Sequence, residues 1–338
     1  MKLSRAVLVS GGILLVAVFS TGADRAKTIG TVVRKDPRLN ALIPTGAALE
    51  RIADGIEWAE GPVWDPRGGV LLFSDVPANT IYRWKDGEGK SVYLKPSGYT
   101  GSAPFTGREP GSNGLAFDVE GRLTFCQHGN RRIVRQERDG SIAVLADRFE
   151  GKRFNSPNDL TIKSSGEIYF TDPPFGLPKA FEDPGKELPF QGVYRISKNG
   201  TVTLLTKEVR APNGIGFSPD EKTFYVANSD PKNPVWYAFE VKEDGTLGKS
   251  RVFYDGSAWA SRGPGVPDSL KVDVHGNVWA AAPRGIYVFA PDGALLGAID
   301  TGVATGNCAF GEDGATLFVA ADHAIGRIRT TTKGLGFP

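Results

Sequence analysis

One short pattern recurs six times along the chain, and this repeat limits the possible folds more than any other feature. Each copy has a polar residue, a hydrophobic strand, a turn with Asp or Gly, and a second strand rich in aromatic residues. The copies start 39 to 55 residues apart, at Glu60, Asn113, Asn158, Asn213, Asp268 and, one residue out of register, Asn307, where Gly306 fits the spacing better. Another strand pair follows each hairpin, which gives four strands per unit, as in a propeller blade.

The repeat predicts an all-β fold, a six-bladed β-propeller with a central metal-binding channel over residues 46–338. The last unit lacks an outer strand, and we expect the segment just before Glu60 to supply it and close the ring. The 43 Gly and 23 Pro residues indicate many tight turns. A β-sandwich, or two unrelated β domains, is the alternative, but neither fold requires a repeat of this length.

The first residues have the order of a secretory signal peptide, which we assign to residues 1–23. Lys2 and Arg5 precede an apolar run that ends at Phe19. A retained membrane anchor is the alternative interpretation. We expect a protein secreted across the inner membrane to the periplasm, with no membrane segment in its mature form, and a polar N-terminal extension over residues 24–45.

Composition restricts the partners. The net charge of +2 gives no indication of nucleic-acid binding. Cys126 and Cys308 lie in different apolar strands, so we expect two buried free thiols rather than a disulfide. A small-molecule ligand and a monomer or small homo-oligomer are expected.

A candidate metal site follows from the register of the repeats. In a propeller, the starts of the innermost strands converge on the axis. Five units place an oxygen-bearing side chain there: Glu60, Asn113, Asn158, Asn213 and Asp268. Such a ring, without His or Cys, suits one hard divalent cation, best Ca²⁺, with Mg²⁺, Mn²⁺ or Zn²⁺ as alternatives. Taken singly, an Asn-Gly pair is more commonly a turn.

Several motifs resemble one known family. They are "EGPVW" at Glu60, "SNGLAFD" at Asn113, "CQHGNRRIVR" from Cys126, "NSPNDL" at Asn158, "FTDPPFG" from Phe170, "PNGIGFSPD" at Asn213, "PDSLKVD" at Asp268 and "NCAFG" at Asn307. Together they resemble the family of senescence marker protein (regucalcin), bacterial gluconolactonase and related lactonases, and most closely its secreted gluconolactonases. The resemblance covers residues 57–320 and specifies the family better than the substrate.

The resemblance implies a six-bladed propeller with one divalent metal in its channel, held by Glu60, Asn158, Asn213 and Asp268. Of these ligands, Asn158 is the one that could bind through water. Asn113 would support a ligand or contact substrate. The implied activity is the opening of a sugar lactone, from glucono-lactone to gluconate. The metal would polarise the carbonyl, and Asp268 would assist water attack as a general base or act directly as a nucleophile.

Other candidate substrate contacts are His128, Arg131 and Phe175. His128 follows the second strand of its unit, where it would contact substrate, carry a proton or simply bond to a turn backbone. Arg131 would hold a sugar hydroxyl or remain solvated. Phe175 would cap the pocket or pack its own loop, and the same two roles are open to Trp259.

Two other functions remain open from the sequence. One is a non-catalytic propeller that binds calcium or a partner protein, and the other is the same hydrolase acting on another lactone or an organophosphate. Loops 95–112 and 173–192 would select the substrate. No G-x-S-x-G or H-E-x-x-H motif occurs, which disfavours a serine hydrolase and a zinc peptidase.

Overall fold

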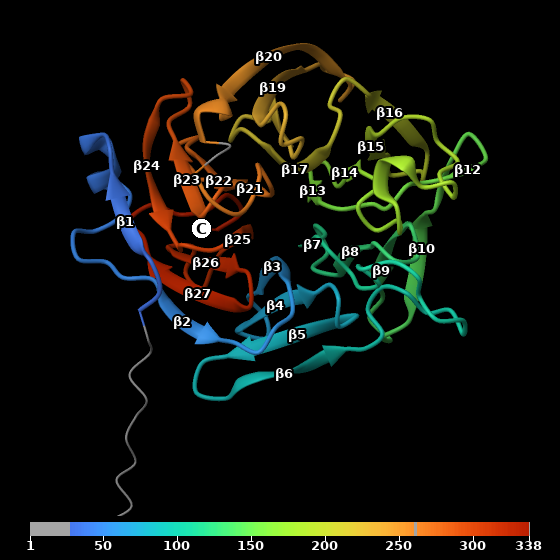
Figure 1. The fold of residues 1–338 in the computed structure, drawn as a ribbon, viewed down its shortest axis with the longest axis horizontal. Coiled ribbons are helices and arrows are strands. Elements are labelled where there is room, and N and C mark those ends of the chain that lie inside the picture. Colours follow the sequence, from blue (N-terminus) through green and yellow to red (C-terminus); the bar gives the residue numbers. More distant parts are fainter. Residues whose placement is uncertain (1–27, 260–261, 338) are drawn as a thin grey trace, which may run out of the picture.

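Six antiparallel sheets are arranged as blades around a central axis in the computed structural model, which describes residues 28–259 and 262–337 (Figure 1). The all-β six-bladed propeller predicted from the repeat is therefore confirmed. Each blade runs from an inner strand at the axis to an outer strand at the rim. The predicted signal peptide, residues 1–23, lies outside the described residues.

Blades 1 to 3 follow one another in chain order. Blade 1 contains β3 (Ala59–Asp65), β4 (Val70–Asp75), β5 (Thr80–Lys85) and β6 (Gly89–Leu94). Blade 2 contains β7 (Leu115–Phe117), β8 (Leu123–Gln127), β9 (Arg132–Gln136) and β10 (Ile142–Ala146). After the small hairpin of β11 (Arg148–Phe149) and β12 (Lys152–Arg153), blade 3 contains β13 (Leu160–Ile162), β14 (Ile168–Asp172), β15 (Gly192–Ile196) and β16 (Val202–Thr206).

Blades 4 to 6 complete the ring. Blade 4 contains β17 (Pro212–Phe217), β18 (Thr223–Asn228), β19 (Val235–Val241) and β20 (Leu247–Asp255). Blade 5 contains β21 (Leu270–Val272), β22 (Val278–Ala282), β23 (Gly285–Phe289) and β24 (Leu295–Asp300). Blade 6 contains β25 (Thr305–Gly311), β26 (Thr316–Ala321) and β27 (Ala324–Arg329).

N-terminal segments add the outermost strands of two blades. β2 (Glu50–Ala53) pairs antiparallel with β27 and completes blade 6, so the predicted closure of the ring is confirmed. β1 (Thr31–Arg34) pairs with β24 as a fifth strand of blade 5. The short 3₁₀ turn η1 (Pro37–Ala41) lies between them. Part of the polar extension is therefore integrated into the sheet.

Apolar residues from the inner, second and third strands fill the spaces between blades. Tyr169 of blade 3 meets Phe217 of blade 4 edge to face, with ring centroids 4.9 Å apart. Trp64 of blade 1 stacks on Phe318 of blade 6 at 5.7 Å, across the junction where the ring closes. Both faces of each sheet are thus buried except at the rim, which explains the nearly continuous apolar runs in the second strands.

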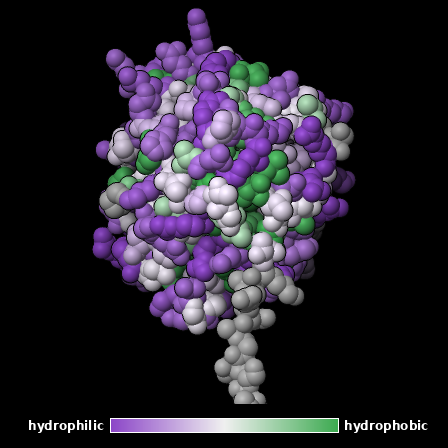
Figure 2. Space-filling view, turned by 90° about the vertical axis from the view of Figure 1, so that its left-hand side faces the viewer, coloured by the Kyte–Doolittle hydropathy of each residue, from purple (hydrophilic) through white to green (hydrophobic). Residues whose placement is uncertain are grey.

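The outer surface is mixed, with polar side chains dominating the face beside β1 and apolar residues scattered among them (Figure 2). Two further 3₁₀ turns, η2 (Ala180–Glu182) and η3 (Ser257–Trp259), lie in connecting loops. Cys126 and Cys308 are buried free thiols, as predicted. Within residues 28–259 and 262–337, no helix has both the length and the apolar character needed to cross a membrane.

Candidate functional site

The five oxygen-bearing residues of the repeat all lie at the starts of inner strands. Glu60 and Asn213 are the second residues of β3 and β17, and Asn113, Asn158 and Asp268 come two residues before β7, β13 and β21. All are buried except Asp268, which is partly buried. In the sixth blade Gly306 fills the equivalent place, because its carbonyl accepts from the Ser269 amide as the Asn158 carbonyl accepts from the Gly114 amide.

A polar residue at the end of the second strand fixes the entry to the inner strand. In blade 3, the two oxygens of Asp172 accept hydrogen bonds from the amides of Asn155 and Ser156, at 2.8 and 2.9 Å. Asp75 and Asn228 accept from backbone amides in the same way in blades 1 and 4. Burial raises the pKa of Asp172 to about 7, although these hydrogen bonds oppose the rise. Asp172 thus fixes the backbone at the start of the "SPND" stretch.

In three blades a glycine directly follows the oxygen-bearing residue of the ring, and this glycine lets neighbouring inner strands approach closely. A Cβ on Gly61 would lie 2.1 Å from the Asn113 carbonyl oxygen, and one on Gly214 would lie 2.4 Å from the Asp268 carbonyl oxygen. No side chain fits at such distances. The Gly after Asn113 and Asn213 therefore serves the close approach of neighbouring blades at the axis, and not only a turn.

Two buried amide oxygens of this ring have no hydrogen-bond partner. The Oδ1 atoms of Asn113 and Asn213 are both buried, and no described residue donates to either. A buried acceptor without a donor is unfavourable unless a cation or another ligand satisfies it. The residues present therefore fit an oxygen-coordinated cation. The described residues contain no group of three or more His, Cys, Asp or Glu placed to hold a metal, so the amides are essential to such a site.

Only one carboxylate oxygen of Glu60 accepts hydrogen bonds from the described residues. Its Oε2 accepts from Asn307 Nδ2 at 3.0 Å and from the Gly61 amide at 3.1 Å. Burial raises the pKa of Glu60 to about 7, and the hydrogen bond from Asn307 opposes this rise. A buried carboxylate with so few donors is the kind of group that a cation stabilises in its ionised form.

Asp159 brings a third carboxylate to the axis. Its Oδ2 accepts from Ser269 Oγ of blade 5 at 2.5 Å, and its Oδ1 accepts from the Leu160 amide. Burial, together with the charges of Glu60 and Asp159, raises the pKa of Asp268 well above its usual range. Sequence reasoning left Asp159 without a role, although its place directly after Asn158 was the available signal.

His128 pairs with a carboxylate that sequence reasoning missed. Its Nε2 lies 2.8 Å from Glu109 Oε2, and its Nδ1 lies 3.0 Å from the Pro157 carbonyl oxygen. Burial alone would lower the pKa of His128, but Glu109 and the carbonyl raise it above its ordinary value. Gly176 lies against the imidazole, where a Cβ would be 2.6 Å from Cδ2, and Gly107 lies against the Gly176 carbonyl. The two loops expected to select substrate thus meet at this histidine.

Two other candidates make contacts in or to loop 173–192. Arg131 donates from Nε to the Phe154 carbonyl at 2.6 Å and from one terminal nitrogen to the Gly185 carbonyl at 3.1 Å, so it anchors loop 173–192. Phe175 meets Phe181 of the same loop edge to face.

Trp259 is buried and stacks on Tyr287 with ring centroids 4.3 Å apart. It packs in the aromatic cluster between blades 4 and 5, so of its two predicted roles the structure supports packing.

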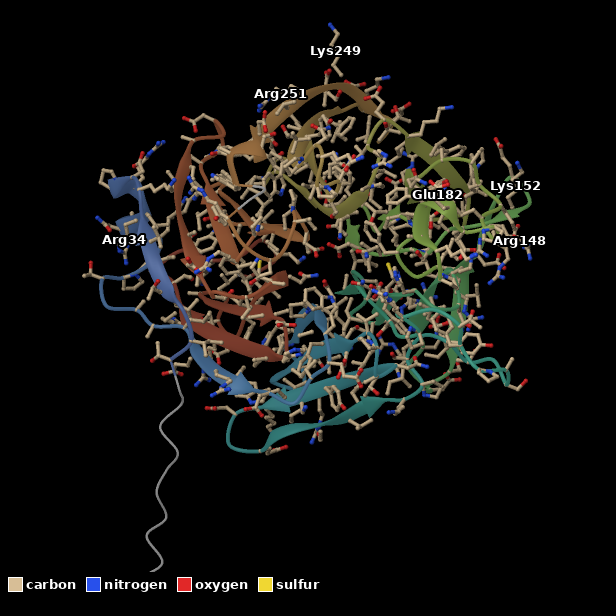
Figure 3. All side chains as sticks on the ribbon, viewed as in Figure 1. Arg34, Arg148, Lys152, Glu182, Lys249 and Arg251 are labelled. Atoms are coloured by element: carbon tan, nitrogen blue, oxygen red, sulfur yellow. The ribbon has the colours of Figure 1, made fainter. Side chains whose placement is uncertain are left out.

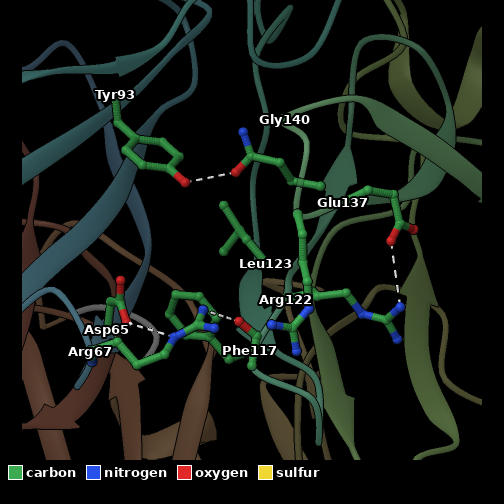
Figure 4. Close-up of a pocket in the computed structure, with 11 residues that line it drawn as sticks. Asp65, Arg67, Tyr93, Phe117, Arg122, Leu123, Glu137 and Gly140 are labelled. Carbon is green, nitrogen blue, oxygen red and sulfur yellow. Dashed lines mark hydrogen bonds and ion pairs between the residues drawn. The ribbon is translucent and has the colours of Figure 1, made fainter.

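One hollow lies away from the axis. A cavity of about 430 Å³ lies between blades 1 and 2 (Figure 4). Its lining includes the turns after β3 and β7, at the ends of these strands opposite to Glu60 and Asn113. Arg122 there faces Glu137 at 3.4 Å and Arg67 faces Asp65 at 3.7 Å, so these charges are already paired.

Comparison with known proteins gives consistent matches. The family described as SMP-30/gluconolactonase/LRE-like region matches residues 58–323. A gluconolactonase of Zymomonas mobilis is 41% identical, covering 98% of this chain and 97% of that protein. A pentonolactonase of Haloferax volcanii is 28% identical, covering 71% and 72%. The solved structure of a gluconolactonase from Xanthomonas campestris has a TM-score of 0.75 at 32% identity, covering 90% of this chain and 99% of that one. These similarities support lactone hydrolysis.

Proposed function

The chain belongs to the SMP-30/gluconolactonase/LRE-like family, as its motifs predicted, and from this premise we propose that it is a divalent-metal-dependent gluconolactonase. The observation that carries the metal dependence is the buried, unpartnered amide oxygen of Asn213, in the same ring as two carboxylates and a second such oxygen on Asn113. The substrate is a sugar lactone, with glucono-lactone first among the candidates.

The cation would be held by Glu60, Asn158, Asn213 and Asp268, with Asn113 beside them as a substrate contact. Ca²⁺ suits this mixture of amide and carboxylate oxygens best. When bound, it would supply Lewis acidity at the lactone carbonyl and stabilise the oxyanion. Most of the ring residues are buried, and such burial strengthens each electrostatic interaction in the site.

Asp268 is the proposed general base. It is the least buried of the five ring residues, so an attacking water can reach it. A carboxylate that holds the cation through one oxygen keeps the other oxygen free to accept a proton from water. It would take the proton of the attacking water and return it to the ring oxygen that leaves when the lactone opens.

His128 and Glu109 are proposed to bind the sugar hydroxyls at the channel mouth. Pro157 and Glu109 give His128 two acceptors, which favours its doubly protonated form. Glu109 keeps a second oxygen for a hydroxyl donor. Phe175 and Arg131 would shape the wall of this mouth through the loop that they fix. Secretion to the periplasm, inferred from residues 1–23, is part of the proposal.

The test is proton release from a panel of lactones, with the chain stripped of metal and refilled with one cation at a time. We expect turnover of glucono-lactone to disappear on stripping and to return with Ca²⁺. Asp268→Asn keeps an oxygen ligand but loses the base, so it should bind Ca²⁺ and lose at least about a hundredfold in turnover. Hydrolysis unaffected by metal removal would refute the metal dependence. A wild-type rate in the metal-loaded variant would refute the role of Asp268.

A further inference from the structure

One lysine stands at a repeat position that is otherwise small or uncharged. Three residues after the oxygen-bearing position, five blades carry Val63, Ala116, Thr161, Gly216 and Ala309, and blade 5 carries Lys271. Lys271 is partly buried, in the middle of inner strand β21. Its neighbours Leu270 and Val272 point into the core between blades 4 and 5, so strand alternation directs Lys271 to the opposite face of the sheet, toward blade 6, where it meets Asn307.

Hydrogen bonds connect this lysine to carboxylates on two other blades. Lys271 Nζ donates to Ser269 Oγ at 3.2 Å, and Ser269 Oγ in turn donates to Asp159 Oδ2 at 2.5 Å. On the other side, Lys271 Nζ donates to Asn307 Oδ1 at 3.4 Å, and Asn307 Nδ2 donates to Glu60 Oε2 at 3.0 Å. The ammonium group is thus two hydrogen bonds away from each of two axial carboxylates.

The residues that carry these bonds share one repeat position. Asp159, Ser269 and Asn307 each follow directly after the residue at the start of the inner strand, where the other three blades have glycine. At this position blades 3, 5 and 6 contribute polar side chains to the network, while Gly61, Gly114 and Gly214 of blades 1, 2 and 4 make close contacts to neighbouring blades.

We infer that Lys271 is a built-in counter-cation of the channel, a positioning residue that sets the charge of the site and so moderates its affinity for the divalent cation. This inference rests on the proposed function. Glu60, Asp159 and Asp268 together carry three negative charges when ionised, and a divalent cation supplies only two positive charges. Lys271 supplies the third, so the loaded site is neutral and accepts the negative charge that develops on a lactone carbonyl.

Removal of the lysine charge should therefore move affinity and turnover in opposite directions. In Lys271→Met the cation no longer meets a nearby positive charge, so Ca²⁺ should bind at least about tenfold more tightly. The loaded site then carries one net negative charge, so an anionic transition state is less favourable and turnover should fall at least about tenfold. A merely structural role would weaken both properties together.

The experiment measures Ca²⁺ affinity by titration calorimetry, and the melting temperature in EDTA and in Ca²⁺, for four proteins. Wild type is compared with Lys271→Met, with Lys271→Arg, which keeps the charge, and with Lys249→Met, on the outer rim far from the axis (Figure 3). Tighter binding should appear as a larger rise in melting temperature on adding Ca²⁺ to Lys271→Met than to wild type. Lys271→Arg and Lys249→Met should match wild type within about twofold in affinity.

The outcomes separate this inference from the proposed function. Wild type that binds no divalent cation would overturn both. Wild type that binds Ca²⁺, together with a folded Lys271→Met that binds it equally or more weakly, would overturn the counter-cation role alone. Tighter binding with reduced turnover supports it.

Discussion

Replacement of Glu60 by Gln should make the metal-free protein more stable while removing its response to metal. Glu60 is buried, and burial raises its pKa from 4.5 to about 7. At about 1.4 kcal/mol per pKa unit, this rise corresponds to about 3 kcal/mol. Gln has the same shape and keeps an acceptor for Asn307 and the Gly61 amide, but it carries no charge.

The pH dependence follows from the direction of the shift. Below pH 4.5, Glu60 is protonated in both the folded and unfolded chain, so wild type and Glu60→Gln should be equally stable. As the pH rises to about 7, the unfolded chain loses this proton first, and metal-free wild type loses about 3 kcal/mol that the variant keeps. Above that pH the difference should stay constant.

Urea denaturation in EDTA at pH 5 and pH 8 measures this difference. Glu182→Gln, on an exposed loop, is the matched control and should change stability by less than about 0.5 kcal/mol. The same titrations with Ca²⁺ should stabilise wild type and the control but not Glu60→Gln. The reasoning is refuted if metal-free Glu60→Gln is no more stable than wild type at pH 8, or if Ca²⁺ stabilises it as much as wild type.

Three further predictions concern the residues around the ring. Asp172→Asn should weaken the fall in metal-free stability between about pH 4 and 7, because the pKa of Asp172 is raised to about 7; equal slopes in a pH series of urea melts would contradict this. Gly306→Ala should lower Ca²⁺ affinity by at least about tenfold, because its Cβ would lie 2.2 Å from Glu60 Oε1, and unchanged calorimetric affinity would exclude this contact. Glu109→Gln should move the His128 titration to lower pH by nuclear magnetic resonance, and an unmoved titration would show that the pair does not form.

The repeat made the propeller and its axial ring accessible from the sequence. Glu60 and Asn213 lie at the starts of inner strands, as predicted. Six equivalent strands around one axis place residues at the same repeat position in equivalent positions around that axis. Even the irregular sixth copy obeyed this rule, with Gly306 in the ring position. The closing strand β2 followed from the same symmetry, since an unpaired edge would otherwise remain.

The sequence repeat could not predict which side chains meet between blades or in the loops. Asp159 bonds to Ser269, 110 residues away, and only the relative tilt of two blades decides that these side chains meet. The pairing of His128 with Glu109 depends on a loop without any periodicity. The packing of Trp259 was equally unpredictable. Its side chain joins an aromatic cluster with Tyr287, and no pattern in the sequence of its loop indicates this contact.

The location of the bound cation tests the central claim most directly. Crystals grown with Mn²⁺ in place of Ca²⁺, measured at the manganese absorption edge, would give one anomalous peak per bound ion. The account predicts a single strong peak on the propeller axis, within bonding distance of Glu60, Asn213 and Asp268. A protein active in Mn²⁺ whose only peak lies away from this ring, or that shows none, would contradict it.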